Sequence, residues 1–185
     1  MSDARGRLLE LLRVLSFQRR RVVLASGKES DFFIDCKQAV LTAEGHALVG
    51  PLMREAIVAF PVRAEAVAGV ELGGCPLASA VAYASFSAGA PLDAVYVRKE
   101  VKDHGSRRLL EGEGRLAKGA AVAIVEDVIT TGGSTLKAAE KLRAAGFVIA
   151  GVVALVDRLE GGREALVAAG LPVTAIYTRR DFIPD

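Results

Sequence analysis

The chain has 185 residues, of which 51% are hydrophobic and 25% charged, and its formal net charge is +2. This length buries one core, so we expect a single domain over residues 1–185. The small positive charge argues against a general nucleic-acid or membrane-surface binder, and no apolar run is long enough to span a bilayer. The amino-terminal residues do not resemble a secretion signal, and the two cysteines lack metal-ligand spacing. We therefore expect reduced thiols and a cytoplasmic protein.

The amino-terminal segment predicts a small unit ahead of the main fold. Leucines at helical spacing predict an amphipathic helix over residues 5–17. Residues 21–24 and 32–35 predict short strands on either side of a loop that contains glycine and serine. A small hairpin or ribbon fits this pattern.

The next segment predicts a helix, a buried strand and a second helix. Residues 42–60 have helical periodicity with Thr42 as the N-cap, and Pro51 deep inside predicts a kink or a break. Residues 66–70 predict a buried strand, and residues 77–86 an alanine-rich helix. The loop between them contains paired glycines and predicts a second anion-binding turn.

Residues 92–97 predict a strand that ends at Arg98. From Lys99 to about Arg115 the sequence is polar, contains glycine and lacks a steady period, so we expect a mobile lid. The cations and His104 of this segment could stabilise a leaving anion as its charge develops. The alternative is an ordinary solvated loop.

The stretch from residue 120 to 135 organises the rest of the chain. It begins as a β-branched apolar run, which predicts a strand buried on both faces of a parallel sheet, and it ends in Glu126 and Asp127. The Thr130–Thr135 loop and the following helix (residues 136–146) predict a phosphate cradle made of N–H groups, hydroxyls and a helix dipole. Two carboxylates suit the vicinal hydroxyls of a ribose, directly or through a divalent metal. Together they predict a ribose 5-phosphate site; a merely N-capped turn is the alternative.

Arg158 follows another buried strand, predicted over residues 148–156. Ligands of open α/β sheets bind at the carboxyl ends of the strands, and a guanidinium offers a planar fork to a carboxylate. The alternative for Arg158 is a surface ion pair with Asp157 or Glu160.

Strands and helices alternate to the end of the chain, with a helix over residues 162–169 and a strand over residues 173–177. The pattern predicts an α/β fold in which a central, mostly parallel sheet is flanked by helices. The Val125–Ser134 motif has neither the Gly-Lys-Ser/Thr ending of a Walker loop nor the Gly-x-Gly-x-x-Gly of a dinucleotide turn. It resembles the phosphoribosyl-diphosphate (PRPP) signature of type I phosphoribosyltransferases.

Two further motifs are similar to those of orotate phosphoribosyltransferases. Residues 26–37 resemble the family's amino-terminal hood, and Arg98–Gly105 resembles its lid signature. The resemblance implies a type I fold with a hood formed mainly by residues 1–40, to which C-terminal residues are further candidates. It also implies transfer of ribose 5-phosphate from PRPP to orotate, giving orotidine 5′-monophosphate and diphosphate in de novo pyrimidine (UMP) biosynthesis. A phosphoribosyltransferase for uracil or a purine, or a non-catalytic PRPP-binding regulator, stays open as an alternative.

The same resemblance implies the residues of the site. Those that would bind PRPP come from three loops: Glu71, Leu72, Gly73, Arg98, Lys99, Lys102, His104, Glu126, Asp127, Val128, Ile129, Thr130, Thr131, Gly132, Gly133 and Ser134. Those that would contact orotate are Thr130, Arg158, and the hood residues Phe33 and Ile34. Catalysis would use Asp127 and Lys102, with His104 as the alternative to Lys102.

The implied cofactor is Mg²⁺, held by PRPP oxygens and water. No dedicated protein site is expected for it, and Asp127 is the candidate protein ligand. The resemblance also implies a homodimer in which lid residues reach the neighbouring subunit's site.

Three positions carry more detailed expectations. A non-proline cis peptide, frequent in the family's diphosphate loop, is expected at Glu71–Leu72. Many relatives carry lysine where this chain has Ala25 and Gly73. Lys28 and Lys37 are candidates to replace the first lysine, whereas backbone donors would have to suffice at Gly73.

Overall fold

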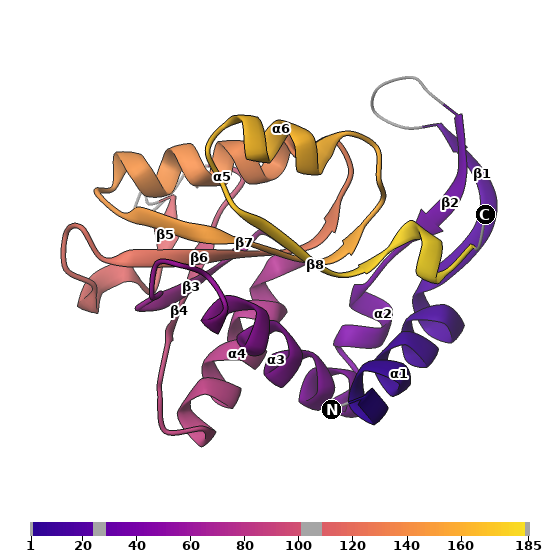
Figure 1. Cartoon of the computed structure of the whole chain (residues 1–185), viewed down its shortest axis with the longest axis horizontal. Helices are drawn as coiled ribbons and strands as arrows, with labels where there is room; N and C mark the ends of the chain where they lie inside the picture. Colours follow the sequence, from indigo (N-terminus) through magenta and orange to yellow (C-terminus); the bar gives the residue numbers. More distant parts are fainter. Residues whose placement is uncertain (1, 24–28, 101–108, 184–185) are drawn as a thin grey trace.

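The apolar runs form a central six-stranded sheet in the computed structural model, which describes residues 2–23, 29–100 and 109–183 (Figure 1). The strand order is β5-β4-β3-β6-β7-β8, and every neighbouring pair is parallel except β4 and β5. The strands are β3 (Ala66–Val70), β4 (Asp93–Val97), β5 (Leu110–Glu111), β6 (Ala121–Ile129), β7 (Val148–Asp157) and β8 (Val173–Thr178). The predicted α/β class and mostly parallel sheet are confirmed.

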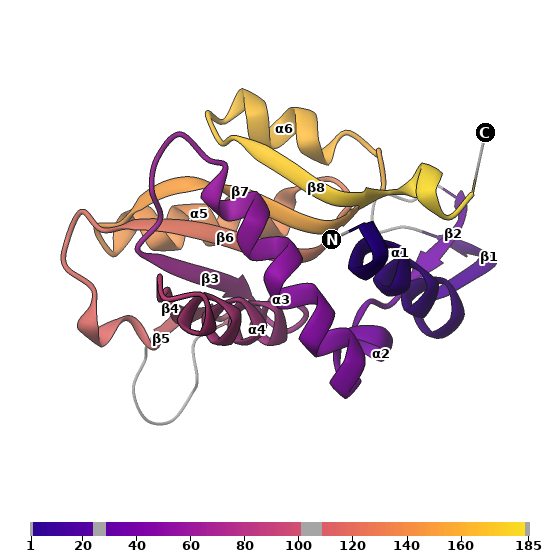
Figure 2. The same cartoon turned by 60° about the horizontal axis from the view of Figure 1, so that its bottom comes forward.

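Helices cover both faces of this sheet, with α3 and α4 on one side and α5 and α6 on the other (Figures 1 and 2). Their bounds are α3 (Ala43–Val58), α4 (Gly74–Ser87), α5 (Gly133–Ala144) and α6 (Gly162–Ala168). Side chains that alternate along a strand enter different cores. Val125 and Val153 pack on the α3–α4 side, whereas Ile124 and Val152 pack on the α5–α6 side. A strand buried on both faces therefore needs the continuous apolar run that the sequence shows.

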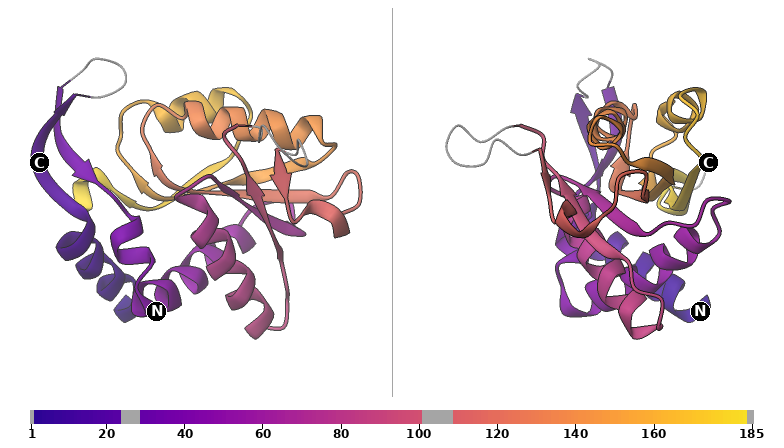
Figure 3. Two further views of the ribbon diagram at one scale, coloured as in Figure 1. Left: turned by 180° about the vertical axis from the view of Figure 1, so that it is seen from behind. Right: turned by 90° about the vertical axis from the view of Figure 1, so that its left-hand side faces the viewer.

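A two-stranded antiparallel ribbon stands beside the sheet, next to the end of β8 (Figures 1 and 3). It consists of β1 (Phe17–Val23) and β2 (Glu29–Ile34). The segments around it are α1 (Ser2–Leu11), a π-helical turn (Leu12–Ser16) and α2 (Lys37–Val40). The predicted ribbon is confirmed. The predicted helix over residues 5–17 is wrong at its end, because Phe17 pairs with Ile34 instead.

The C-terminal segment ties this ribbon to the sheet. After β8 a short 3₁₀ helix (Arg179–Asp181) brings Phe182 against Phe17 and Phe32, with ring centroids 5.6 Å apart in both pairs. Arg179 also forms a 2.5 Å ion pair with Asp31 of β2. Contacts from the C-terminal segment thus fix the ribbon beside the carboxyl ends of the strands.

Helix α3 runs unbroken through Pro51, so the predicted break is wrong. The helix persists because Val49, Leu52 and Met53 on its inner face are buried in the core, which offsets the hydrogen bond lost at proline. Thr42 is the N-cap, as predicted, and its hydroxyl accepts from the Gly45 N–H at 3.0 Å. Among the residues described here, no helix combines the length and apolarity needed to cross a membrane.

Candidate active site

The carboxyl ends of the parallel strands bring the predicted site residues to one edge of the sheet. Glu71 follows β3, Arg98 follows β4, Thr130 follows β6 and Arg158 follows β7. Crevices at this edge are where open α/β sheets bind ligands.

The loop after β6 has the geometry of an anion cradle. Gly132 adopts a left-handed conformation with φ of 79° and caps α5, which begins at Gly133. The first N–H groups of α5 lack helical partners and point away from the helix, so they are available to an anion. Thr131, Gly133 and Ser134 are exposed, so the predicted phosphate loop is open rather than sealed in the core.

Glu126 lies beneath this loop. Its side chain is 5% exposed, and its Oε2 accepts hydrogen bonds of 3.1 Å from both Ser134 Oγ and Thr135 Oγ1. Burial, together with the neighbouring Asp127 charge, raises the pKa of Glu126 to about 8. The expected phosphate-binding role of the Thr135 hydroxyl is therefore wrong, because the hydroxyl is buried and directed to Glu126. The carboxylate of Glu126 therefore lies on the buried side of the loop, and not on the exposed side that would meet a ligand.

Asp127 has a different environment from its neighbour. It is half-buried, and its Oδ1 accepts the Val128 N–H at 3.0 Å. A Cβ built at Gly73 would lie 2.0 Å from Asp127 Oδ2, so this carboxylate lies against the loop after β3. Any side chain at position 73 would require the Asp127 carboxylate to move.

The loop after β3 contains the expected cis peptide at Glu71–Leu72. The Glu71 N–H donates to Val97 O at 2.9 Å, and its side-chain Oε2 accepts the Lys99 N–H at 2.9 Å. Leu72 is 63% exposed, and Gly73 stands immediately before α4. This loop is thereby joined to the end of β4 through backbone and side chain.

The end of β4 is held from its other side by α5. Lys141 Nζ donates to the carbonyl oxygens of Arg98 at 2.7 Å and Lys99 at 2.9 Å. Arg98 Nη1 lies 3.4 Å from Glu111 Oε1 on β5. A cavity of about 340 Å³ beside Ser134 is lined by cations from both segments, among them Lys137.

The carboxyl-terminal part of the predicted lid belongs to the sheet and the turn that follows it. Leu110 and Glu111 form β5 and pair with Val97 and Tyr96, so the expectation of a mobile segment to Arg115 is wrong. Hydrogen bonding to the sheet edge explains the order of this part. Lys102 and His104 lie outside the described residues.

Arg158 lies at the tip of β7, and its side chain is 10% exposed. Its Nη2 is 2.9 Å from Glu160 Oε1, and its guanidinium carbon lies 5.5 Å from the centroid of the Phe32 ring. The Arg158 N–H donates to Ile129 O at 3.0 Å, which joins this turn to the end of β6. The ion pair with Glu160 that the sequence left open is present, but it is largely buried, not on the surface.

The turn after β7 also packs directly on the phosphate loop. A Cβ at Gly162 would lie 2.5 Å from Thr130 O and 2.8 Å from Gly132 N, and a Cβ at Gly132 would lie 2.9 Å from Gly162 O. Only glycine permits this approach, so an anion cradle and a buried guanidinium occupy adjacent turns at one edge of the sheet.

The chain matches the phosphoribosyl transferase domain over residues 44–166. It is 75% identical to orotate phosphoribosyltransferase of Sorangium cellulosum (strain So ce56) over 184 residues, which cover 100% of this chain and 95% of that relative. This chain belongs to the orotate phosphoribosyltransferase family. The crystal structure of Mycobacterium tuberculosis H37Rv orotate phosphoribosyltransferase in complex with Fe(III) dicitrate is similar, with a TM-score of 0.82, 39% identity, and coverage of 97% of this chain and 99% of that one. The complex of the same enzyme with PRPP has a TM-score of 0.78 and 35% identity over 97% of this chain and 98% of that one.

Within this type I phosphoribosyltransferase fold, the predicted hood residues divide between two faces of β2. Ile34 is 9% exposed and belongs to the core, whereas Phe33 lies under the Arg20 guanidinium, 3.9 Å from its ring centroid. Phe32, which directly precedes Phe33 in β2, is the residue whose ring contacts Arg158. Alternation along a strand explains why neighbouring phenylalanines face different partners.

Some of the other predicted site residues can contribute only their backbone atoms. Ile129 is 1% exposed, so only its main chain can serve the site, and Val128 is half-buried. Lys37, a candidate substitute for the missing hood lysine, forms a 2.5 Å ion pair with Asp35 that raises the pKa of Lys37. The other candidate, Lys28, and Ala25 itself lie outside the described residues.

Sequence reasoning missed three residues that support the site: Phe32, Lys141 and the structural role of Glu160. Lys141 and Phe32 carry no local signal, because their partners are distant in the chain. Glu160 stands two residues after Arg158, and the sequence offers only a surface ion pair for it, because the burial of this turn depends on the tertiary structure.

Proposed function

We propose that this protein, in the cytoplasm, transfers the ribose 5-phosphate of PRPP to orotate in UMP biosynthesis. The observation that carries the proposal is the close approach of Gly132 and Gly162, which joins an anion cradle to the turn that bears Arg158. A nucleotide whose base carries a carboxylate has the complementary groups, a phosphate at one end and a carboxylate at the other.

In the proposed reaction a ring nitrogen of orotate bonds to the anomeric carbon of PRPP as the bond from that carbon to diphosphate breaks. The electron pair of the broken bond leaves with the diphosphate, and the ribose acquires oxocarbenium character. Backbone donors of Thr130–Ser134 hold the 5-phosphate, and Asp127 accepts from the ribose hydroxyls. Glu126 supports the phosphate loop from its buried side, because it accepts hydrogen bonds from the hydroxyls of Ser134 and Thr135. Arg158 binds the orotate carboxylate, and orotate, already an easily deprotonated heterocycle, needs no strong protein base.

Magnesium is the proposed cofactor. Among the residues that the structure describes, no group of three or more His, Cys, Asp or Glu side chains could hold a metal ion by itself. In this proposal PRPP oxygens and water hold the cation, and the candidate protein ligand is the half-buried Asp127, whose carboxylate lies against the loop after β3. Bound Mg²⁺ would neutralise charge on the diphosphate.

The lid supplies the remaining charge in this proposal. Arg98 and Lys99 stand where it begins, and Lys102 stabilises or protonates the departing diphosphate, with His104 as the alternative. We expect Lys102→Ala to lower turnover by roughly 100-fold while orotate affinity changes little, as general-acid and charge-stabilising roles require. A variant with wild-type turnover would remove Lys102 from the mechanism.

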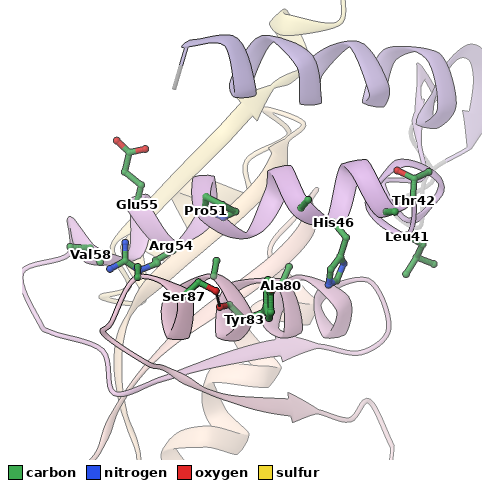
Figure 4. A pocket seen from close by; sticks show the side chains of 14 residues that line it. Leu41, Thr42, His46, Pro51, Arg54, Glu55, Val58, Ala80, Tyr83 and Ser87 are labelled. Atoms are coloured by element: carbon green, nitrogen blue, oxygen red, sulfur yellow. Dashed lines mark hydrogen bonds between the residues drawn. The ribbon is translucent and has the colours of Figure 1, made fainter.

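We also propose a homodimer with shared lids, docked through α3 and α4. A groove of about 910 Å³ lies across these two packed helices, and Tyr83, which lines it, is 76% exposed (Figure 4). Leu41 and Val58, which also line this groove, are 65% and 66% exposed. Such contiguous apolar exposure suits a docking surface. A second copy there would adjoin β4, which leads into the lid.

Light scattering after size exclusion tests this assembly. We expect a dimer mass for the native chain and a monomer mass for Tyr83→Glu. Val167→Glu, on α6 at the opposite face, is the matched control and should remain dimeric. A monomeric native chain would contradict the proposed assembly.

The activity test is PRPP-dependent loss of orotate absorbance with the purified protein. Uracil and hypoxanthine are offered as competing substrates in parallel. Consumption of uracil or hypoxanthine in preference to orotate would assign another base, and binding of PRPP without turnover of any base would indicate a regulator.

A further inference from the structure

Arg158 and Glu160 form a largely buried ion pair, and the reaction described above assigns a role only to Arg158. Their side chains are 10% and 20% exposed, and Arg158 Nη2 lies 2.9 Å from Glu160 Oε1. A buried pair costs desolvation energy and adds little net stability. Its presence at the end of β7 therefore calls for a role other than stabilisation.

The backbone that carries the pair is held on both sides. The Asp157 carboxylate accepts the Leu159 N–H at 2.8 Å, and Leu159 adopts a positive φ of 56°. At the far end Gly162 packs against the phosphate loop with no room for a side chain. The turn thus fixes where the carboxylate of Glu160 stands relative to Arg158.

The guanidinium of Arg158 is also held through its face. It lies 5.5 Å from the centroid of Phe32, a fully buried ring of the hood. Arg179 lies 5.6 Å from the same ring. A ring contact restrains the plane of a guanidinium, whereas a carboxylate at one edge restrains its rotation within that plane.

We propose that Glu160 is a positioning residue that orients the Arg158 guanidinium for the carboxylate of the base. This inference rests on the proposed function, in which Arg158 binds orotate. A guanidinium can hold two carboxylates at once, because its five N–H groups lie along different edges of one plane. Glu160 holds one edge, so that orotate meets a donor array already in place and loses less entropy on binding.

The first test compares Glu160→Ala and Glu160→Gln with the native chain by steady-state kinetics. We expect Glu160→Ala to raise the KM for orotate by roughly tenfold, which is the lower end of the effect of losing a hydrogen bond to a charged group. The KM for PRPP should change less than about twofold. Glu160→Gln keeps an acceptor oxygen and should restore most of the loss. Glu164→Ala, an exposed change on α6, is the matched control and should leave both KM values unchanged.

The second test separates positioning from a structural role. In an Arg158→Gln background, Glu160→Ala should add less than about twofold to the orotate KM, because the residue acts through Arg158. An undiminished effect in that background, or a Glu160→Ala protein with the native or a lower orotate KM, would overturn the inference. Should Glu160→Ala fail to fold, Glu160→Met, which removes the acceptor oxygen but keeps the volume of the side chain, gives the same comparison. A native protein that does not consume orotate would instead overturn the proposed function itself.

Discussion

The two ends of the candidate site are built in different ways. The phosphate end is one continuous segment, in which Glu126 and the Thr130–Ser134 loop follow each other along the chain. The base end is assembled from Arg158 and Glu160 in the turn after β7, Phe32 in the hood and Arg179 after β8. Local chain geometry can create an anion cradle, because backbone donors and a helix terminus supply it. Recognition of a planar carboxylate needs a side chain, and that side chain needs supports from elsewhere in the fold.

The largest effect is expected where the two ends meet. Gly162→Ala would place a Cβ 2.5 Å from Thr130 O, so the turn and the loop would have to separate. We expect roughly a 100-fold loss of kcat/KM for both substrates, because small displacements of positioned groups are costly. Stability should fall by about 1–3 kcal/mol, as for other overpacked sites.

Gly6→Ala is the matched control for this change. A Cβ at Gly6 in α1 would meet nothing within 4 Å, so activity should be retained. Loss of orotate activity alone in Gly162→Ala, with PRPP binding intact, would show that the two ends are less tightly joined than the structure indicates.

Arg158→Gln should break the base end alone. Removing the guanidinium leaves the orotate carboxylate without its charged partner, so the KM for orotate should rise by roughly 10- to 100-fold. The KM for PRPP should stay near its native value, because the phosphate loop is unaffected. Arg163→Gln, an exposed change on the next helix, is the control and should alter neither KM. If Arg158→Gln raised the KM for orotate and the KM for PRPP equally, the distinction between the two ends would be removed.

The buried acid at the phosphate end predicts a pH dependence of stability. Burial raises the pKa of Glu126 to about 8 in the folded chain, from the ordinary glutamate value of 4.5. Between these pH values the folded state binds a proton that the unfolded state has lost, so the free energy of unfolding should fall as pH rises from about 5 to 8.

Urea midpoints of the ligand-free protein at several pH values measure this slope. Glu126→Gln cannot ionise and should reduce the decline. Should the variant and the native chain lose stability equally over this range, Glu126 is not the group responsible.

The smallest effects should separate two hydroxyls of the same loop. Thr135→Val removes a buried donor to Glu126 and should lower stability by about 1 kcal/mol, with little change in the KM for PRPP. Thr131 is exposed, so Thr131→Val should instead weaken PRPP binding without loss of stability. The opposite pattern in thermal unfolding and kinetics would reverse the assignment of these hydroxyls.

Individual elements show where prediction from sequence worked. The run Ala121–Val125 is apolar at every position, so it predicts a doubly buried strand without knowledge of its neighbours. The N-cap at Thr42 and the Glu71–Leu72 cis bond were also predicted from short patterns and resemblance. By contrast, Leu110 and Glu111 read as part of a lid, because a two-residue strand depends on its partner at Tyr96 and Val97.

The sequence alone determined the order of the longer strands and helices, the anion cradle and the kinship with orotate phosphoribosyltransferases, because these depend on residues adjacent in the chain. Only the tertiary structure decided that Glu126 lies behind the phosphate loop, that Gly73 makes room for Asp127, and that Arg158 stands between Glu160 and Phe32. Burial and close contact decide these roles, and both arise from segments that meet only when the sheet, its helices and the hood pack together.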